Sequence, residues 1–246
     1  GRQGDRVGVC VSVPVVGSGG VTGRRGEPTA AWLAENPLDA QAASGIVVTS
    51  EHGASVSGDV IEAALQEHKP KWAAMAHWET GSGRINDLEG FSAACEKYNV
   101  LGLVDAVSSL GVGAFRIDDY PGIHGWASCP QKGLSCLPLT YAPVSFSDRF
   151  IETLNTSGTR TFVHHPVMEA RHWAIIEGKD VEKGTYHRTH SAYAVAAFHE
   201  ALRITLNQGL TARAQEYAYH EAALRIAVEA MGCEVTSNMT SLVVLN

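Results

Sequence analysis

The stretch of residues 86–105, NDLEGFSAACEKYNVLGLVD, combines a helical pattern of apolar residues with a continuous apolar run. Four of its apolar residues share one face of a helix: Leu88, Phe91, Cys95 and Tyr98. Asn86 is a candidate N-cap of this helix, with Glu89 three residues later as its capping-box partner. The following run, Val100–Val104, is continuously apolar and ends at Asp105, which predicts a strand buried on both faces of a parallel sheet.

The neighbouring segments repeat this alternation. Residues 59–68 have helical periodicity with Pro70 just beyond, and residues 72–77 form a short apolar run before the turn at 78–83. Strand, helix and strand in succession predict an α/β fold with a mixed, mostly parallel sheet flanked by helices.

The rest of the chain is less regular. We expect strands near Val9–Val13 and Tyr141–Phe146, a helix from Ser147 or Asp148, and two long helices, Ser191–Gln208 and Thr211–Met231. The second long helix has an apolar stripe that includes Leu224. Residues 1–209 are predicted to form a large domain with an incomplete N-terminal part, and residues 210–246 the start of a smaller C-terminal α+β domain.

Composition narrows the class of protein. The 246 residues carry a net charge of -7, which argues against a nucleic-acid binder. No apolar run is long enough to span a bilayer. Five scattered cysteines without a C-x-x-C pair indicate reduced thiols, and hence an intracellular protein whose compartment (cytoplasm, mitochondrion or peroxisome) the sequence does not distinguish. The chain starts without Met and ends in an apolar run, so we expect it to be truncated.

Three polar features follow predicted strands: the turn at 77–83, Asp105, and the segment 128–132 that ends in Lys132. Ligands of open parallel sheets bind at the carboxyl ends of the strands. A pyridoxal phosphate (PLP) enzyme needs a lysine for the Schiff base, a carboxylate for the pyridinium nitrogen and a polar pocket for the phosphate and 3-hydroxyl. Lys132 and Asp105 are candidates for the first two roles.

The order of the motifs strengthens this hypothesis. HWETGSG (77–83), LVDAVSSLG (103–111), SCPQKGL (128–134), YAPVSFS (141–147) and GTYHRT (184–189) occur in succession. Together they resemble the class V PLP-dependent aminotransferases, and above all the alanine–glyoxylate and serine–pyruvate aminotransferases. The resemblance covers roughly residues 58–232 and implies the PLP-dependent transferase fold type I.

The resemblance also implies a role for each motif residue. Lys132 would form the Schiff base with PLP and move the proton between Cα and C4′. Asp105 would pair with the pyridinium nitrogen, and Val107 would pack against one face of the ring. Thr80 would hydrogen-bond the 3-oxygen, and Gln131 would help to hold the phosphate. Tyr186 and Thr189 would reach the phosphate of the neighbouring subunit's cofactor, which implies a homodimer. The activity implied is transfer of an amino group from alanine or serine to glyoxylate or pyruvate.

Several positions depart from the family pattern. Gly81-Ser82-Gly83 replaces Ser-Thr-Gly, and Cys129-Pro130 replaces Gly-Ser before the lysine. Trp78 replaces a small or polar residue and is expected to narrow the site. No residue matches the family's ring-stacking aromatic residue or its substrate-carboxylate arginine. Gly17-Ser-Gly-Gly20 is a weak candidate for a phosphate loop because it precedes no clear helix.

Other functions remain open at this point. A class V lyase or cysteine desulfurase would keep the cofactor but needs a mobile nucleophilic cysteine. A catalytically inactive truncated paralogue would act as a binding subunit. A metal site is disfavoured, because His187 and His190 lack a carboxylate-containing motif such as H-E-x-x-H.

Overall fold

The structure, a computed structural model, describes residues 7–11, 44–48, 54–137, 142–157, 166–172, 186–187 and 189–238. Its main sheet has the order β2-β1-β3-β6-β7-β8. The strands are β1 (Val7–Val11), β2 (Ser44–Val48), β3 (Trp72–Ala76), β6 (Leu101–Asp105), β7 (Ile123–Ala127) and β8 (Val144–Phe146). All neighbouring pairs are parallel except β7 and β8. The predicted mixed, mostly parallel sheet is confirmed.

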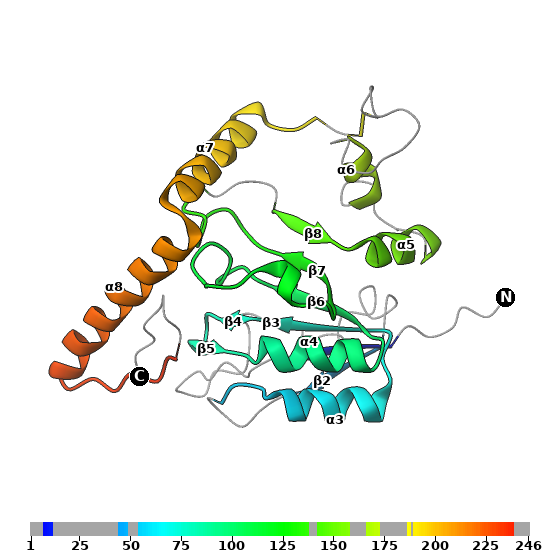
Figure 1. The fold of residues 1–246 in the computed structure, drawn as a ribbon, viewed down its shortest axis with the longest axis horizontal. Coiled ribbons are helices and arrows are strands. Elements are labelled where there is room, and N and C mark those ends of the chain that lie inside the picture. Colours follow the sequence, from blue (N-terminus) through cyan, green and yellow to red (C-terminus); the bar gives the residue numbers. More distant parts are fainter. Residues whose placement is uncertain are drawn as a thin grey trace, which may run out of the picture.

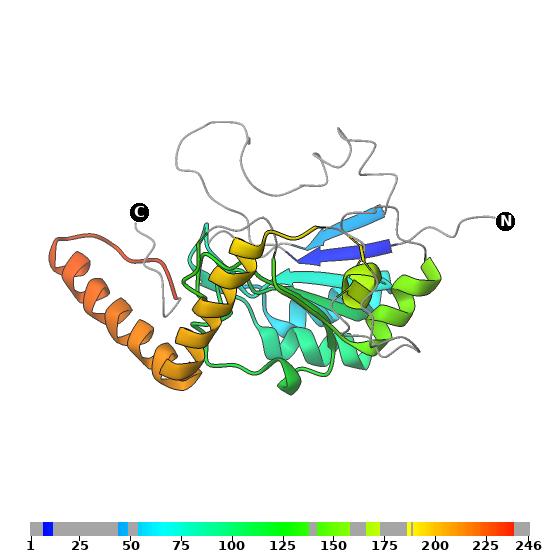
Figure 2. The same cartoon turned by 90° about the horizontal axis from the view of Figure 1, so that it is seen from above.

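Helices flank this sheet (Figures 1 and 2). They are α3 (Gly58–His68), α4 (Leu88–Lys97), α5 (Asp148–Ser157), α6 (Pro166–His172), α7 (Ala192–Gln208) and α8 (Leu210–Ala230), with a 3₁₀ turn, η1 (Ile117–Asp119). The turn after β3, predicted as irregular, contains a small antiparallel hairpin of β4 (Trp78–Glu79) and β5 (Arg84–Ile85). Helix α6 was not predicted from the sequence.

The core lies between the sheet and the pair α3 and α4, which run side by side along one face (Figure 1). The predicted stripe of α4 points into it: Leu88, Phe91 and Cys95 are at most 1% exposed, and Tyr98 packs at its edge. Burial raises the pKa of the Cys95 thiol to about 12, so Cys95 is a packing residue and not a nucleophile.

The cap of α4 differs from the prediction. Asn86 is not the N-cap but is 2% exposed, where Oδ1 accepts from the Val56 amide (3.0 Å) and Nδ2 donates to the Ala76 carbonyl (2.7 Å). The cap is Asp87, whose Oδ1 accepts from the Gly90 amide at 2.8 Å. The correction has a physical reason: buried backbone groups need partners, and the amide of Asn86 can both accept and donate where a carboxylate can only accept.

Asp87 also caps a second helix. Its Oδ2 accepts from the Gly58 amide at the start of α3 (2.9 Å), where the nominal N-cap, Ser57, makes no side-chain cap. The two helices approach closely here, because a Cβ built on Gly90 would lie 2.5 Å from the Gly58 Cα. One carboxylate therefore satisfies donors at two helix N-termini at once.

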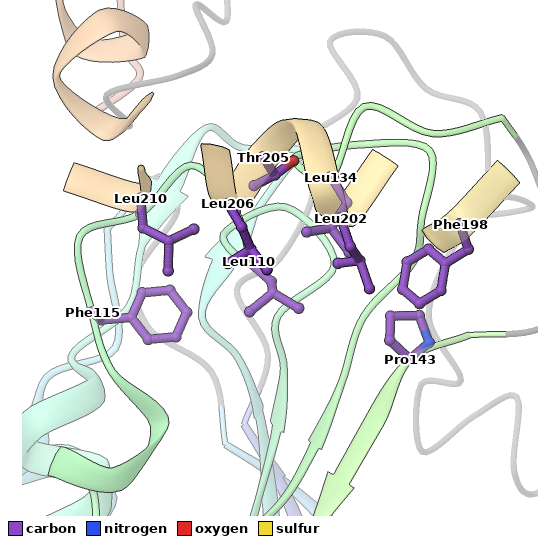
Figure 3. A pocket seen from close by; sticks show the side chains of 11 residues that line it. Leu110, Phe115, Leu134, Pro143, Phe198, Leu202, Thr205, Leu206 and Leu210 are labelled. Carbon is purple, nitrogen blue, oxygen red and sulfur yellow. The ribbon is translucent and has the colours of Figure 1, made fainter. Parts of the chain in front are cut away.

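Helices α7 and α8 meet at Gly209, which has a φ of +85°, a conformation that glycine adopts readily. α7 crosses the loops at one end of the sheet, and α8 continues away from it (Figures 1 and 2). Beneath α7 lies an apolar pocket of about 330 Å³, lined by Leu110, Phe115, Leu134, Phe198 and Leu202 among others (Figure 3).

The expected apolar stripe of α8 is not buried in the described part of the chain, where Leu224 is 51% exposed and the buried residue of the helix is Arg213. The domain boundary near residue 210 stays a prediction. The candidate phosphate loop Gly17–Gly20 and Tyr141 lie outside the described residues.

Replacing Asp87 with alanine should remove the side-chain caps of α3 and α4 together. The expected loss is about 1–3 kcal/mol in the free energy of unfolding, since a single cap is worth roughly 0.5–2 kcal/mol. Urea unfolding would measure the loss. The matched control is Asp59→Ala, which removes an exposed carboxylate from the first turn of α3 and should cost much less. Equal stabilities for the two variants would contradict the double cap.

Candidate active site

Three parallel strands place their carboxyl ends at one edge of the sheet. The register pairs Ala76 of β3 with Asp105 of β6, and Asp105 with Ala127 of β7. Three loops leave from these neighbouring ends, at 77–83, 106–113 and 128–135. They contain the three polar features singled out in the sequence, which therefore lie at one edge of the sheet.

The loops meet at the amine of Lys132. Its Nζ donates to Thr80 Oγ1 and to Ser108 Oγ, each at 3.0 Å. The two hydroxyls also hydrogen-bond to each other, which closes a triangle of polar groups. These partners lie 52 and 24 residues from Lys132 in the sequence. All three side chains belong to residues that stay in contact with solvent, so a small molecule can reach the amine.

Asp105 ends β6 beside this triangle and is exposed. Its Oδ1 accepts from the Val107 amide at 2.8 Å, and its carbonyl accepts from the His77 amide at 2.9 Å. Within the described residues, Oδ2 takes part in no hydrogen bond. The carboxylate is therefore oriented through one oxygen while the other can receive a ligand.

The remaining predicted residues divide into two groups. Val107 is half-buried, and its carbonyl lies 3.9 Å from the Cys129 thiol; Gln131 is exposed beside Lys132. Tyr186 and Thr189 do not join the Lys132 triangle: they hydrogen-bond to each other at 2.7 Å, and Tyr186 is 71% exposed. The structure thus brings Thr80, Asp105, Val107 and Lys132 to one loop cluster and places Tyr186 with Thr189 in another.

Two residues of the site were missed by sequence reasoning. Ser108 lies inside the quoted motif at 103–111, three residues after Asp105, and a hydroxyl at that position in a strand-end loop is the signal that could have identified it. His77 opens the first motif and is buried at 7% exposure. Its Nδ1 lies 3.1 Å from Ser109 Oγ, and its ring packs edge-on against Phe115.

Trp78 does not narrow the site as expected. It is 6% exposed and packs with Val112, Ile85 and Tyr217 in a small apolar cluster behind the loops. The Trp78 side chain is accommodated among these apolar neighbours.

The donor set fits PLP. An amine, two hydroxyls and a carboxylate with one available oxygen are gathered at the carboxyl edge of a parallel sheet, and these are the groups that the cofactor's aldehyde, 3-oxygen and ring nitrogen require. Among the described residues, no group of His, Cys, Asp or Glu is arranged to hold a metal ion. No helix among them is long and apolar enough to cross a bilayer. Fold and site together define a PLP-dependent transferase of fold type I.

Comparison with known proteins supports this class. No family model matches the sequence. The chain is 34% identical over 163 residues to the alanine–glyoxylate aminotransferase of Oryctolagus cuniculus, which covers 65% of this chain and 41% of the relative. It is 28% identical over 184 residues to the (S)-ureidoglycine–glyoxylate transaminase of Bacillus subtilis, an alignment that covers 68% of this chain and 43% of the relative. The chain thus spans less than half the length of these relatives.

Solved structures agree. The alanine–glyoxylate aminotransferase of Nostoc sp. superposes with a TM-score of 0.74 at 25% identity, over 95% of this chain and 57% of that one. The ureidoglycine–glyoxylate aminotransferase of Bacillus subtilis superposes with a TM-score of 0.76 at 22% identity, over 96% of this chain and 56% of that one. In sequence and in fold, the chain is similar to the class V PLP-dependent aminotransferases, whose cofactor is pyridoxal phosphate.

Acid should destabilise the protein through His77. Burial lowers the pKa of its imidazole from the ordinary 6.5 to about 4. Between these pH values the unfolded chain binds a proton that the folded chain does not, so stability is complete above pH 6.5 and falls as the pH drops towards 4. The loss attributable to His77 is about 3 kcal/mol.

Urea unfolding of His77→Gln and of the wild type from pH 7.5 to 4 measures this contribution. The variant should lose less stability across the range, because glutamine does not titrate. The matched control is His220→Gln, at an exposed position on α8, which should follow the wild-type curve. Parallel curves for His77→Gln and wild type would show that His77 does not cause the acid loss.

Proposed function

We propose that this chain forms the cofactor-binding part of an aminotransferase in which Lys132 holds PLP. An amino group would pass from a small amino acid, alanine or serine, to a 2-oxo acid, glyoxylate or pyruvate. The observation that carries the proposal is the bonding of Lys132 Nζ to Thr80 and Ser108 at a sheet edge that also presents Asp105. The names of the relatives, which specify glyoxylate, support the acceptor.

Each residue has a chemical task in this proposal. When bound, PLP supplies an electron sink for the negative charge that develops at Cα of the amino acid. The Asp105 carboxylate, at its Oδ2, keeps the ring nitrogen protonated and so maintains that sink. Nζ of Lys132 holds the cofactor first and then carries the proton removed from Cα, as a positioned general base and acid.

The hydroxyls and the flanking residues orient the ring. Thr80 Oγ1 serves the 3-oxygen, with Ser108 Oγ completing the polar triangle around Nζ. Val107 packs against one ring face, and Gln131 helps to hold the phosphate. Positioning of this kind accounts for a large part of the rate of an intramolecular step.

Tyr186 and Thr189 serve a second cofactor in the proposal. Their separation from the Lys132 triangle, together with their mutual hydrogen bond, suits a role at the phosphate held by a neighbouring subunit. The active form would then be a homodimer with sites at the interface. Tyr186 is exposed in the single chain, as such a role requires.

Lysine 132 should be the attachment point of PLP. After incubation with PLP and reduction with borohydride, mass spectrometry of the wild type should find a pyridoxyl group on Lys132. Lys132→Ala should lack both this adduct and the visible absorbance of the bound cofactor. Lys71→Ala, at an exposed lysine beside β3, is the control and should behave as wild type. A wild type that takes up no PLP would sink the proposed function.

Asp105→Asn tests the electronic role separately. Asparagine can keep the Oδ1 bond to the Val107 amide, so the fold should be preserved, but it cannot hold the ring nitrogen protonated. We expect about 10²-fold slower formation of pyruvate from alanine and glyoxylate, in line with the loss of one electrostatic stabiliser. Wild-type rates in this variant would contradict the assignment of Asp105, and activity in the wild type would exclude an inactive binding subunit.

A further inference from the structure

We propose that Arg213 is a positioning residue that clamps the Ser108 loop to the Lys132 loop and so sets the geometry around Lys132 Nζ. The relevance to catalysis rests on the proposed function, but the clamp itself is a property of the chain alone. Arg213 lies in the first turn of α8, outside all the motifs that carry the family resemblance to the cofactor site, and it is 6% exposed.

The guanidinium of Arg213 bonds to both loops. Its Nε donates to the Gly111 carbonyl at 2.9 Å, and its Nη2 donates to the Gly133 carbonyl at 2.8 Å. The hydroxyl of Ser135 accepts a further hydrogen bond from Nη2. These acceptors lie 102, 80 and 78 residues away in sequence, so the side chain joins segments that no local structure connects.

Two residues of α7 and α8 hold the other side of the guanidinium. Nη1 donates to Gln208 Oε1 at 2.8 Å, and the Tyr217 ring lies 5.2 Å from the guanidinium carbon. Among the described residues, every hydrogen-bond acceptor of Arg213 is a neutral oxygen. Burying a cation is costly unless its donors are satisfied, and here all three guanidinium nitrogens donate to oxygens of the described residues.

Glycines make the clamp possible. A Cβ built on Gly133 would lie 2.2 Å from the Leu110 carbonyl oxygen, and one on Gly111, where φ is +88°, would lie 2.8 Å from the Gly133 oxygen. The backbones of the two loops therefore touch, and neither glycine has a side chain that could hold the other loop. At this contact Arg213, from a third element, donates hydrogen bonds to both loops.

The clamped atoms lie next to the catalytic triangle. Gly133 directly follows Lys132, and the Ser135 amide donates to the Lys132 carbonyl at 2.8 Å. Gly111 follows Ser108 by three residues. If the guanidinium were removed, both glycine carbonyls would lose a charge-assisted partner, and the loops could separate. The bond from Nζ to Ser108 Oγ spans those loops, so it would be weakened directly.

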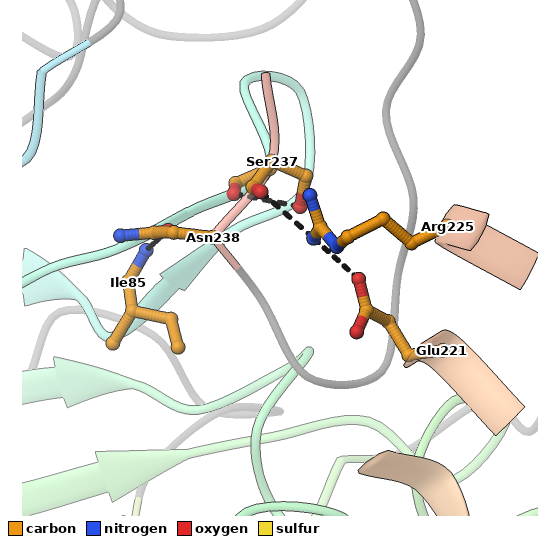
Figure 4. A network of polar contacts seen from close by, with 6 residues as sticks. Ile85, Glu221, Arg225, Ser237 and Asn238 are labelled. Atoms are coloured by element: carbon orange, nitrogen blue, oxygen red, sulfur yellow. Dashed lines mark hydrogen bonds and ion pairs between the residues drawn. The ribbon is translucent and has the colours of Figure 1, made fainter. Parts of the chain in front are cut away.

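Helix α8 is also linked to the loop at 77–83, which contains Thr80, but only through residues 237–238 (Figure 4). Arg225 donates to the Ser237 carbonyl at 2.9 Å, and the Ser237 hydroxyl donates to the Gly83 carbonyl at 2.9 Å. Asn238 Oδ1 accepts from the Ile85 amide at 2.8 Å. This tether is indirect, through residues 237–238, whereas Arg213 contacts its two loops itself.

Hydrogen exchange of the 246-residue protein without cofactor tests the clamp. Arg213→Met keeps the bulk of the side chain and removes every donor. Exchange should accelerate by about tenfold or more for the amides of segments 107–113 and 130–136, since charge-assisted hydrogen bonds are lost, while exchange in α3 and α4 should not change. Arg203→Met, at an exposed arginine paired with Glu200 on α7, is the control and should leave both loops at wild-type rates.

The second measurement concerns Lys132. We expect the rate at which PLP becomes reducible onto Lys132 by borohydride to fall by about tenfold in Arg213→Met, and its pH dependence to shift because Nζ loses a fixed hydrogen-bond partner. Circular dichroism would verify folding. If Arg213→Met does not fold, Arg213→Lys decides, because lysine keeps the charge but cannot bond both glycine carbonyls in one fork.

The outcomes separate the two proposals. Wild-type exchange rates in both loops of the folded variant would overturn the clamp. Faster exchange with an unchanged rate and pH profile of Lys132 modification would overturn the positioning role. A wild type that takes up no PLP, together with faster exchange in Arg213→Met, would overturn the proposed function and leave the clamp supported.

Discussion

The parallel register of β3, β6 and β7 fixes where the three loops of the site begin. It pairs Ala76 with Asp105 and Asp105 with Ala127, so the chain leaves the sheet at three adjacent points of one edge. Loops that begin side by side need only a few residues to meet. The hydroxyls of Thr80 and Ser108 can therefore bond to one amine although they come from distant parts of the sequence. The buried apolar face of α4, which includes Phe91, packs against this sheet in the core.

The ionisable groups in and around the site differ in how deeply they are buried. Lys132 and Asp105, the ionisable groups of the proposed chemistry, are exposed. His77, whose backbone amide donates to the Asp105 carbonyl, is buried, and burial lowers its pKa to about 4, so it stays neutral at neutral pH. Arg213 is the exception, a buried cation whose acceptors within the described part of the chain are all neutral oxygens. Its desolvation costs free energy, which the hydrogen bonds to two loops offset. The burial of Arg213 is explained by its position, because the backbones at Gly111 and Gly133 touch and neither glycine has a side chain that could join the two loops.

Much of the site could be predicted from the sequence, because its signals are local. A continuous apolar run ending in Asp105 identified the strand and its carboxylate, and the motif order identified Lys132 and Thr80. The errors arose where partners are distant. Asn86 resembled an N-cap, but buried amide and carbonyl groups of other segments required its side chain, and Asp87 capped the helix instead. Ser108 was overlooked because a hydroxyl in a strand-end loop does not by itself show that a lysine 24 residues later donates to it.

The alternation of strands and helices, the acidic composition and the identity of the polar residues at the strand ends follow from the amino-acid sequence alone. The periodicity of apolar residues and the points where apolar runs end are properties of neighbouring residues. Both can therefore be recognised in the sequence alone. Only the tertiary structure decided which side chains meet. In the pattern of α8, Arg213 is one more polar residue of a long helix, and only the crossing of α7 over the sheet edge buries it between the two glycine loops. Contacts of that kind depend on how segments pack, and no local pattern contains that information.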